Sequence, residues 1–274
     1  MDLRRCLPLL LAVSLFAGCG DNGGSPDPAA DPPSPAASSS SATRTPYEVI
    51  QGPLARCGPQ PAAAATVDFE HVRLRSPAYG VTPAITAGHG RTVVVLLHQT
   101  DNNGLCGWLG FAPTLVEQPG VALLALDLCG YGESRCRTGA DPIAPVAAAV
   151  EHARTAMRAD KVVLLGASMG GSVALIAATR LPGIATAVDL SGPVEWRGME
   201  EVRQGRALPV PVLVAMADDE GEDEVDGARR IVANAPRGSE LVPAEAGHGY
   251  ELLLDRDDRT TSVADRVLSW IAAS

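Results

Sequence analysis

The sequence predicts an α/β protein with a mostly parallel central sheet and helices on both faces. The first observation is a series of short, mostly apolar runs that suit strands buried on both sides. The second is that Ala-rich segments suited to helices separate several of these runs. The third is a G-x-S-x-G motif placed directly between one such run and one such helix. The runs are Thr92–Leu97, Val121–Asp127, Val162–Leu165, Ile184–Leu190 and Pro211–Ala217.

The motif Gly166-Ala167-Ser168-Met169-Gly170 joins a buried strand to a helix that starts near Ser172. A serine at such a sharp turn sits in strained backbone, and the flanking glycines keep side chains away from the turn. The hydroxyl then stands clear of the sheet, and the N–H of the next residue points to where an oxyanion would form. This context predicts that Ser168 is a nucleophile and that Met169 donates to the oxyanion.

Composition narrows the class of protein. The chain has 274 residues, enough for one α/β domain with a sizeable core, and only 4% of them are aromatic. The formal net charge of −10 argues against binding to nucleic acid or to an anionic membrane by overall charge.

The first 46 residues are predicted to lie outside the folded domain. Residues 1–19 have the layout of a secretory signal, with a basic start, an apolar run too short to span a bilayer, and small residues before Cys19. Cys19 after Ala17-Gly18 resembles the lipobox of bacterial lipoproteins, which implies lipidation of Cys19 and attachment to a membrane; an ordinary signal peptide is the alternative. Residues 20–46 are rich in Pro, Ser and Ala and predict a flexible tether to a domain at 47–274.

Four cysteines remain within that domain: Cys57, Cys106, Cys129 and Cys136. In an exported protein they suggest up to two disulfides, for which three pairings are possible. Cys106 follows one central strand, and Cys129 and Cys136 follow the next, so a bond from Cys106 to one of these two is expected.

The remaining elements follow in order along the chain. A hairpin is expected from Thr66–Arg75 and Val81–Ala87, and helices from Leu105–Gln118, from Asp141 to about Met157, from Asp223–Ala235 and from Asp258–Ala273. A short strand is expected at Ser239–Val242. About twenty residues separate the strand ending at Leu190 from the next one, so no large lid is expected there.

Two loops resemble those of the α/β-hydrolase family. His98-Gln99-Thr100 follows a central strand where the family has His-Gly and then an oxyanion donor, and Asp127 to Ser134 resembles its Asp-x-x-Gly-x-Gly-x-Ser loop. The resemblance covers residues 66–274 and implies the α/β-hydrolase fold. It also implies that the N–H of Thr100 is the second oxyanion donor and that His98 supports the loop. Gln99 replaces the usual Gly, so it narrows the site or becomes the donor itself.

The resemblance also implies a base and an acid. His248, in a Gly-flanked loop before the last helix, occupies the position of the family's general base. The acid is expected directly after the strand at Pro211–Ala217, where Asp219 is preferred, Asp218 is second and Glu220 is third. Ser, acid and His then follow in the chain order of the family.

Together these residues predict a serine hydrolase that cleaves carboxylic esters of small or medium size through an acyl-enzyme, with no metal or cofactor required. A peptidase or an acyltransferase with the same three residues is one alternative, and a non-catalytic ligand-binding lipoprotein is another. The expected partner is a small ester substrate. The sequence leaves the oligomeric state open.

Overall fold

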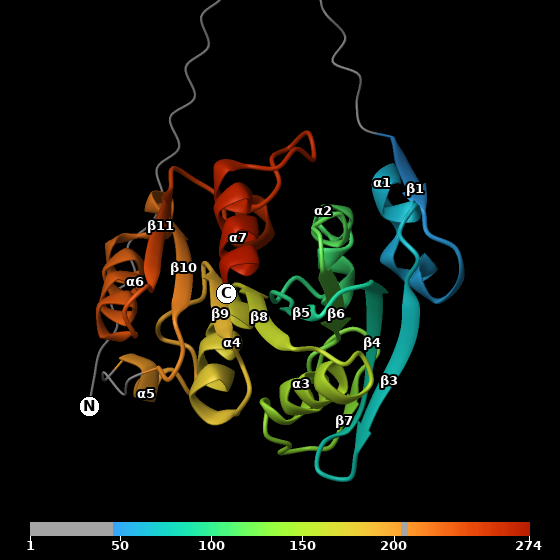
Figure 1. The fold of residues 1–274 in the computed structure, drawn as a ribbon, viewed down its shortest axis with the longest axis horizontal. Helices are drawn as coiled ribbons and strands as arrows, with labels where there is room; N and C mark the ends of the chain where they lie inside the picture. The colour runs from blue at the N-terminus through green and yellow to red at the C-terminus, as the bar shows by residue number, and fades with distance from the viewer. Residues whose placement is uncertain (1–45, 204–207) are drawn as a thin grey trace, which may run out of the picture. The chain divides into compact units, whose positions relative to one another are not determined.

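The computed structural model describes residues 46–203 and 208–274, so the predicted signal peptide, Cys19 and nearly all of the predicted tether lie outside the described residues. Within the described part, nine strands form one open sheet in the order β11-β10-β9-β8-β5-β6-β4-β3, with β7 paired to β4 (Figure 1). The strands β5, β6 and β8 to β11 run parallel, whereas β3, β4 and β7 are antiparallel to their neighbours. This is the α/β-hydrolase fold that the sequence predicted.

The sheet strands match the predicted runs closely. The hairpin is formed by β3 and β4, and the apolar runs become β5, β6, β8, β9 and β10. The bounds are β3 Glu70–Ser76, β4 Gly80–Gly88, β5 Thr92–Leu97, β6 Val121–Leu126, β7 Arg135–Cys136, β8 Lys161–Ala167, β9 Thr186–Leu190, β10 Val212–Ala217 and β11 Glu240–Ala244.

Alternation along the strands divides the core into two layers. In β5, for example, Val93, Val95 and Leu97 point to one face, and Val94 and Leu96 point to the other. The first face is covered by α3 (Ala144–Thr155), α4 (Met169–Arg180) and α6 (Glu222–Asn234). The second face is covered by α2 (Ala112–Val116) and α7 (Ser262–Ala273), as Figure 1 shows. Helices on both faces were expected, because strands buried on two sides need cover on both.

Three predicted helices begin later in the structure, and one of them is α7, which starts at Ser262 rather than at Asp258. The helix expected at 105–118 is a 3₁₀ turn, η2 (Gly104–Trp108), followed by the short α2, because Pro113 fits only the first turn of a helix. The helix expected from Asp141 begins at Ala144, where Pro145 occupies the first turn and the Asp141 carboxylate accepts the N–H of Ile143 at 3.0 Å.

Residues 46–65 fold against the sheet and give no periodic signal in the sequence. They form β1 (Tyr47–Val49), the 3₁₀ helix η1 (Gly52–Cys57), β2 (Pro59–Pro61) and α1 (Ala62–Ala65). A disulfide joins Cys57 to Cys106 and a second joins Cys129 to Cys136. The expected bond from Cys106 to Cys129 or Cys136 is therefore wrong, because η1 lies against η2 and brings Cys57 to Cys106.

A buried ion pair fixes the same segment to the loops at the sheet's carboxyl edge. The Asp127 carboxylate is fully buried and accepts hydrogen bonds from the Arg56 guanidinium at 2.9 Å and from the N–H groups of Leu105 and Glu133, both at 2.8 Å. A single carboxylate thus holds three segments that are far apart in the sequence. Such a group is satisfied only while all three remain in place.

Asp189 is a second buried carboxylate, in the middle of the parallel strands. Its side chain is 1% exposed; one oxygen accepts the Gly192 N–H at 2.7 Å, and the other has no partner among the described residues. Burial raises the pKa of Asp189 to about 7, and the nearby Glu224 and Glu220 act in the same direction, whereas the bond from Gly192 opposes the shift. The folded protein therefore holds a proton on Asp189 over a pH range in which the unfolded chain does not.

This difference predicts how stability changes with pH. Because the pKa rises from 3.8 to about 7 on folding, the wild-type free energy of unfolding should fall as the pH rises through this window. Asp189→Asn imitates the protonated acid and does not titrate. Its stability relative to wild type should therefore increase by about 2–3 kcal/mol between pH 5 and pH 8, measured by urea unfolding. Parallel stability curves for the two proteins would contradict this assignment.

Candidate active site

The strand–turn–helix at Ser168 has the strained backbone that the sequence predicted for this turn. Ser168 has φ 51° and ψ −121°, a left-handed conformation that non-glycine residues rarely adopt. A side chain at Gly166 would lie 2.0 Å from the Gly170 carbonyl oxygen, and one at Gly170 would lie 2.0 Å from the Leu97 carbonyl oxygen. Glycine at both positions is therefore what allows the turn to close and α4 to approach the end of β5.

Neighbouring strands fix Ser168 from below. Its N–H donates to the Leu190 carbonyl at 2.7 Å, and the N–H of Ser191 donates to the Ala215 carbonyl at 2.9 Å. The ends of β8, β9 and β10 therefore meet at one edge of the sheet, where α/β proteins bind their ligands. Ser168 itself is 8% exposed, and its hydroxyl makes no hydrogen bond within the described residues.

His248 lies in a loop that touches the strand end preceding Ser168. Glycines with φ +111° and +58°, Gly247 and Gly249, flank it and allow a tight turn. A β-carbon on Gly249 would lie 3.5 Å from the Ala167 β-carbon and 2.1 Å from Oε1 of Gln99. Because Ala167 precedes Ser168 and Gly249 follows His248, the hydroxyl and the imidazole are carried by neighbouring segments, although no hydrogen bond joins the two side chains within the described residues.

Glu220, rather than Asp219, contacts the imidazole. Nδ1 of His248 lies 2.6 Å from Oε1 of Glu220, whose side chain is 18% exposed, whereas Asp218 and Asp219 are exposed to solvent. All three acids lie in the 3₁₀ turn η3 (Asp218–Glu220) that directly follows β10. The tight turn carries its third residue, Glu220, toward the His248 loop, whereas the sequence analysis preferred Asp219 and placed Glu220 third.

The expected oxyanion donors lie on two adjoining segments. Met169 is the first residue of α4, so its N–H has no intrahelical acceptor. The N–H of Thr100 likewise has no hydrogen-bond partner among the described residues, and Thr100 is exposed. The N–H of Gln99 instead donates to the Tyr250 hydroxyl at 3.1 Å, which leaves Thr100 as the available donor in this loop.

His98 and Tyr250 support this loop from inside. The Leu128 N–H donates to Nε2 of His98 at 2.9 Å, so the ring proton is on Nδ1 and donates to the Gln99 carbonyl at 2.7 Å. Burial lowers the pKa of His98, which favours this neutral form. Tyr250 was not singled out by its sequence pattern. Its ring lies over Gly107, edge-on to Trp108 with 4.9 Å between centroids, and it links the His248 loop to the loop after β5.

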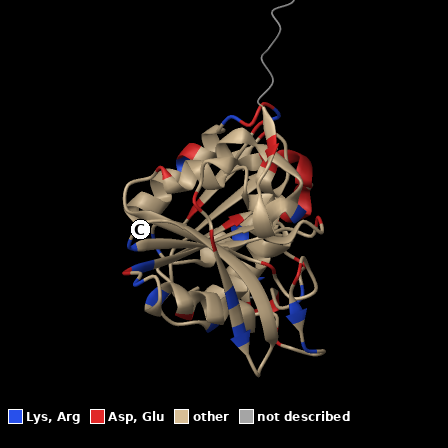
Figure 2. Cartoon of the chain, turned by 90° about the vertical axis from the view of Figure 1, so that its right-hand side faces the viewer, with Lys and Arg blue, Asp and Glu red and all other residues tan. Residues whose placement is uncertain are grey.

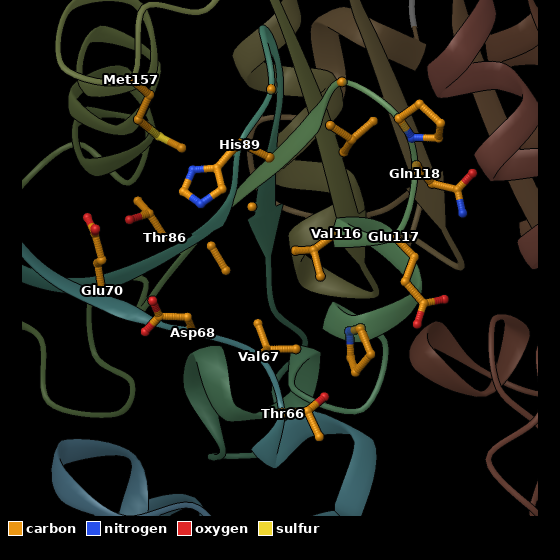
Figure 3. Close-up of a pocket in the computed structure, with 18 of the residues that line it drawn as sticks. Thr66, Val67, Asp68, Glu70, Thr86, His89, Val116, Glu117, Gln118 and Met157 are labelled. Carbon is orange, nitrogen blue, oxygen red and sulfur yellow. The ribbon is translucent and has the colours of Figure 1, made fainter.

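A cavity of about 800 Å³ opens beside the His248–Glu220 pair. It is bordered by the N-terminal segment, since the Tyr47 hydroxyl donates to the Asp258 carboxylate at 2.8 Å and both residues line the cavity. A second cavity, of about 700 Å³, lies near His89, Gly120 and Val121 at the opposite edge of the sheet (Figure 3). That edge carries the amino ends of β5 and β6, so this cavity is separate from the candidate site.

The chain is similar to known hydrolases in sequence pattern and in fold. The family model described as alpha/beta hydrolase fold matches residues 92–205. A solved esterase from Pyrococcus furiosus shares 16% identity with a TM-score of 0.62, covering 76% of this chain and 93% of the esterase. A carboxylesterase from Bacillus subtilis shares 17% identity with a TM-score of 0.58, covering 77% of this chain and 94% of that enzyme. No curated protein matches the sequence significantly. The strand order, the turn at Ser168 and these similarities agree that the chain has the α/β-hydrolase fold.

Proposed function

We propose that the protein is a serine hydrolase that cleaves carboxylic esters through an acyl-enzyme. The observation that carries the proposal is the strained Ser168 turn next to the loop that bears the His248–Glu220 pair. The esterases among the solved structures with this fold favour an ester over other acyl substrates.

In the proposed mechanism, His248 takes the Ser168 proton on Nε2 as the hydroxyl oxygen attacks the ester carbonyl carbon. Glu220 accepts a hydrogen bond from Nδ1–H, so it fixes the tautomer and stabilises the imidazolium. The N–H groups of Met169 and Thr100 stabilise the oxyanion. The alcohol then leaves with the proton from His248, and a water molecule activated by the same imidazole hydrolyses the acyl-enzyme.

The proposed substrates are esters of small or medium size. The segment between β9 and β10 spans 191–211, and the part of it that the structure describes contains one short helix, α5 (Glu200–Arg203). No described element of this segment is large enough to form a cap, and His248 is 46% exposed at its side chain. An open site of this kind offers little apolar surface to a long acyl chain.

We also propose that the chain is exported and anchored through a lipid on Cys19. No helix within the described residues is long and apolar enough to cross a membrane. The two disulfides are compatible with an oxidising compartment.

Replacing the nucleophile is the direct test of the reaction. Ser168→Ala should lower kcat/KM for p-nitrophenyl acetate by at least about 10⁴-fold and abolish labelling by a fluorophosphonate, because no other group can form the acyl-enzyme. An unchanged thermal unfolding temperature serves as the folding control. Full residual activity of Ser168→Ala would refute the serine mechanism.

The size of the substrate is tested separately on the wild-type protein. Rates measured over p-nitrophenyl esters of increasing chain length should peak at short or medium chains.

A second comparison tests the acid. Glu220→Gln keeps the size of the side chain but removes its charge, so the imidazolium loses its counter-ion and kcat should fall by about 10³- to 10⁴-fold. Asp219→Asn and Asp218→Asn remove one charge each from the same turn and should have far smaller effects. If Asp219→Asn proved the most damaging of the three, Glu220 would not be the acid.

The anchor is tested by fractionation. Cys19→Ala should move the activity from the membrane fraction to the soluble fraction, because the acyl chains supply most of the membrane affinity. If the wild-type activity were already soluble, residues 1–19 would be an ordinary signal peptide.

A further inference from the structure

A groove of about 400 Å³ runs along the antiparallel edge of the sheet, apart from the candidate active site. One wall is η1, which contributes Pro53 and Leu54, and the floor comes from β3, β4 and β7. No residue lines both this groove and the cavity beside His248. The η1 wall of the groove is fixed in place by the Cys57–Cys106 disulfide.

The groove concentrates positive charge in an acidic protein. Its ionisable lining consists of Arg56, His71, Arg73, Arg75, Arg135 and a single acid, Glu133. The chain as a whole carries a formal net charge of −10. Figure 2 views the molecule from this side, and Lys and Arg, in blue, mark the edge strands.

Three of these guanidinium groups have no counter-ion in the described structure. Arg56 is neutralised by Asp127 and lies 3.9 Å from Glu133. Arg73 and Arg75, by contrast, make no side-chain hydrogen bond or ion pair with any described residue. Arg135 bonds only to the neighbouring Ser134 carbonyl, at 3.0 Å.

The strand register points these side chains to one face. His71, Arg73 and Arg75 alternate along β3, so they share a face and are spaced by about 7 Å. Arg75 is opposite Val81 on β4, and Val81 is in turn opposite Arg135 on β7. Arg75 and Arg135 are therefore two strands apart, about 10 Å between α-carbons, within the reach of two arginine side chains to a common ligand.

Charged residues on an edge strand also prevent sheets from joining edge to edge. That role accounts for Arg73 and Arg75, because β3 is the edge strand. The same role could cover Arg135, because β7 pairs only with β4, but it does not account for the wall that η1 adds beside the three charges.

We propose that this groove is a binding site for a phosphate group, carried by a small soluble molecule or by a phospholipid headgroup. Guanidinium groups bind phosphate oxygens in pairs through parallel N–H donors, and they lose less hydration than ammonium groups do. A multiply charged oxyanion neutralises three guanidinium groups better than a single carboxylate does. The apolar wall of Pro53 and Leu54 excludes water from one side, which strengthens each contact.

The test compares two charge-matched triple variants of the full chain, each carrying Cys19→Ala so that no acyl chain contributes. The groove variant removes the three unpaired charges of the groove and combines Arg73→Gln, Arg75→Gln and Arg135→Gln. The control variant removes the same charge from exposed positions elsewhere and combines Arg158→Gln, Arg230→Gln and Arg237→Gln. Binding is measured by calorimetry with inorganic pyrophosphate, and by co-sedimentation with vesicles of phosphatidylglycerol or of phosphatidylcholine.

The groove variant should bind at least about tenfold more weakly than the control variant, and binding by the Cys19→Ala protein with its groove intact should weaken as salt is added. Loss of pyrophosphate binding identifies a soluble phosphate as the ligand; loss confined to phosphatidylglycerol vesicles identifies a lipid headgroup. Equal loss in both triple variants relative to the Cys19→Ala protein, or no binding by the Cys19→Ala protein to either probe, overturns the proposal. Thermal unfolding confirms folding, and the single variants Arg75→Gln and Arg135→Gln provide the same comparison if the triple variant is unstable.

Discussion

The absence of side chains at Gly166 and Gly170 is the constraint on which the site depends. The Gly170 carbonyl and the Leu97 carbonyl occupy the space that β-carbons at these positions would need. The same close approach holds Ser168 in its left-handed conformation and brings the start of α4 to the end of β5. The candidate nucleophile and both candidate oxyanion donors are therefore positioned by backbone packing, and no side-chain contact of Ser168 is needed.

A few side chains hold the loops around Ser168 in place. Asp127 binds three segments through one carboxylate, and Tyr250 joins the loop after β5 to the loop that carries His248. Gln99, which stands where the loop that this one resembles has glycine, is accommodated because Gly249 has no side chain. The departure from the family pattern at one position is thus matched by an open space at another, and the loop keeps a free N–H at Thr100.

The sequence was informative wherever burial alone determines structure. Runs such as Val93–Leu97 are short and rich in β-branched residues, which favours a buried strand over a helix, and the strand before Ser168 and the helix after it make the motif specific. The acid could not be chosen among Asp218, Asp219 and Glu220, because a 3₁₀ turn rotates successive side chains by about a third of a turn and leaves no apolar pattern. The disulfide partner of Cys57 could not be predicted either, because residues 46–65 are held in place by an ion pair and a disulfide rather than by periodic apolar residues.

The disulfide between Cys57 and Cys106 also gives the protein a dependence on its chemical surroundings. It closes a loop of 49 residues that contains β3, β4 and β5, and chain-entropy models assign such a crosslink about 4 kcal/mol of stability. In a reducing compartment the disulfide does not form, so the protein lacks this contribution to its free energy of unfolding. The contribution is a large part of the stability of an ordinary domain. The chain is therefore less stable before its thiols are oxidised, and the same oxidation fixes η1, which forms a wall of the charged groove.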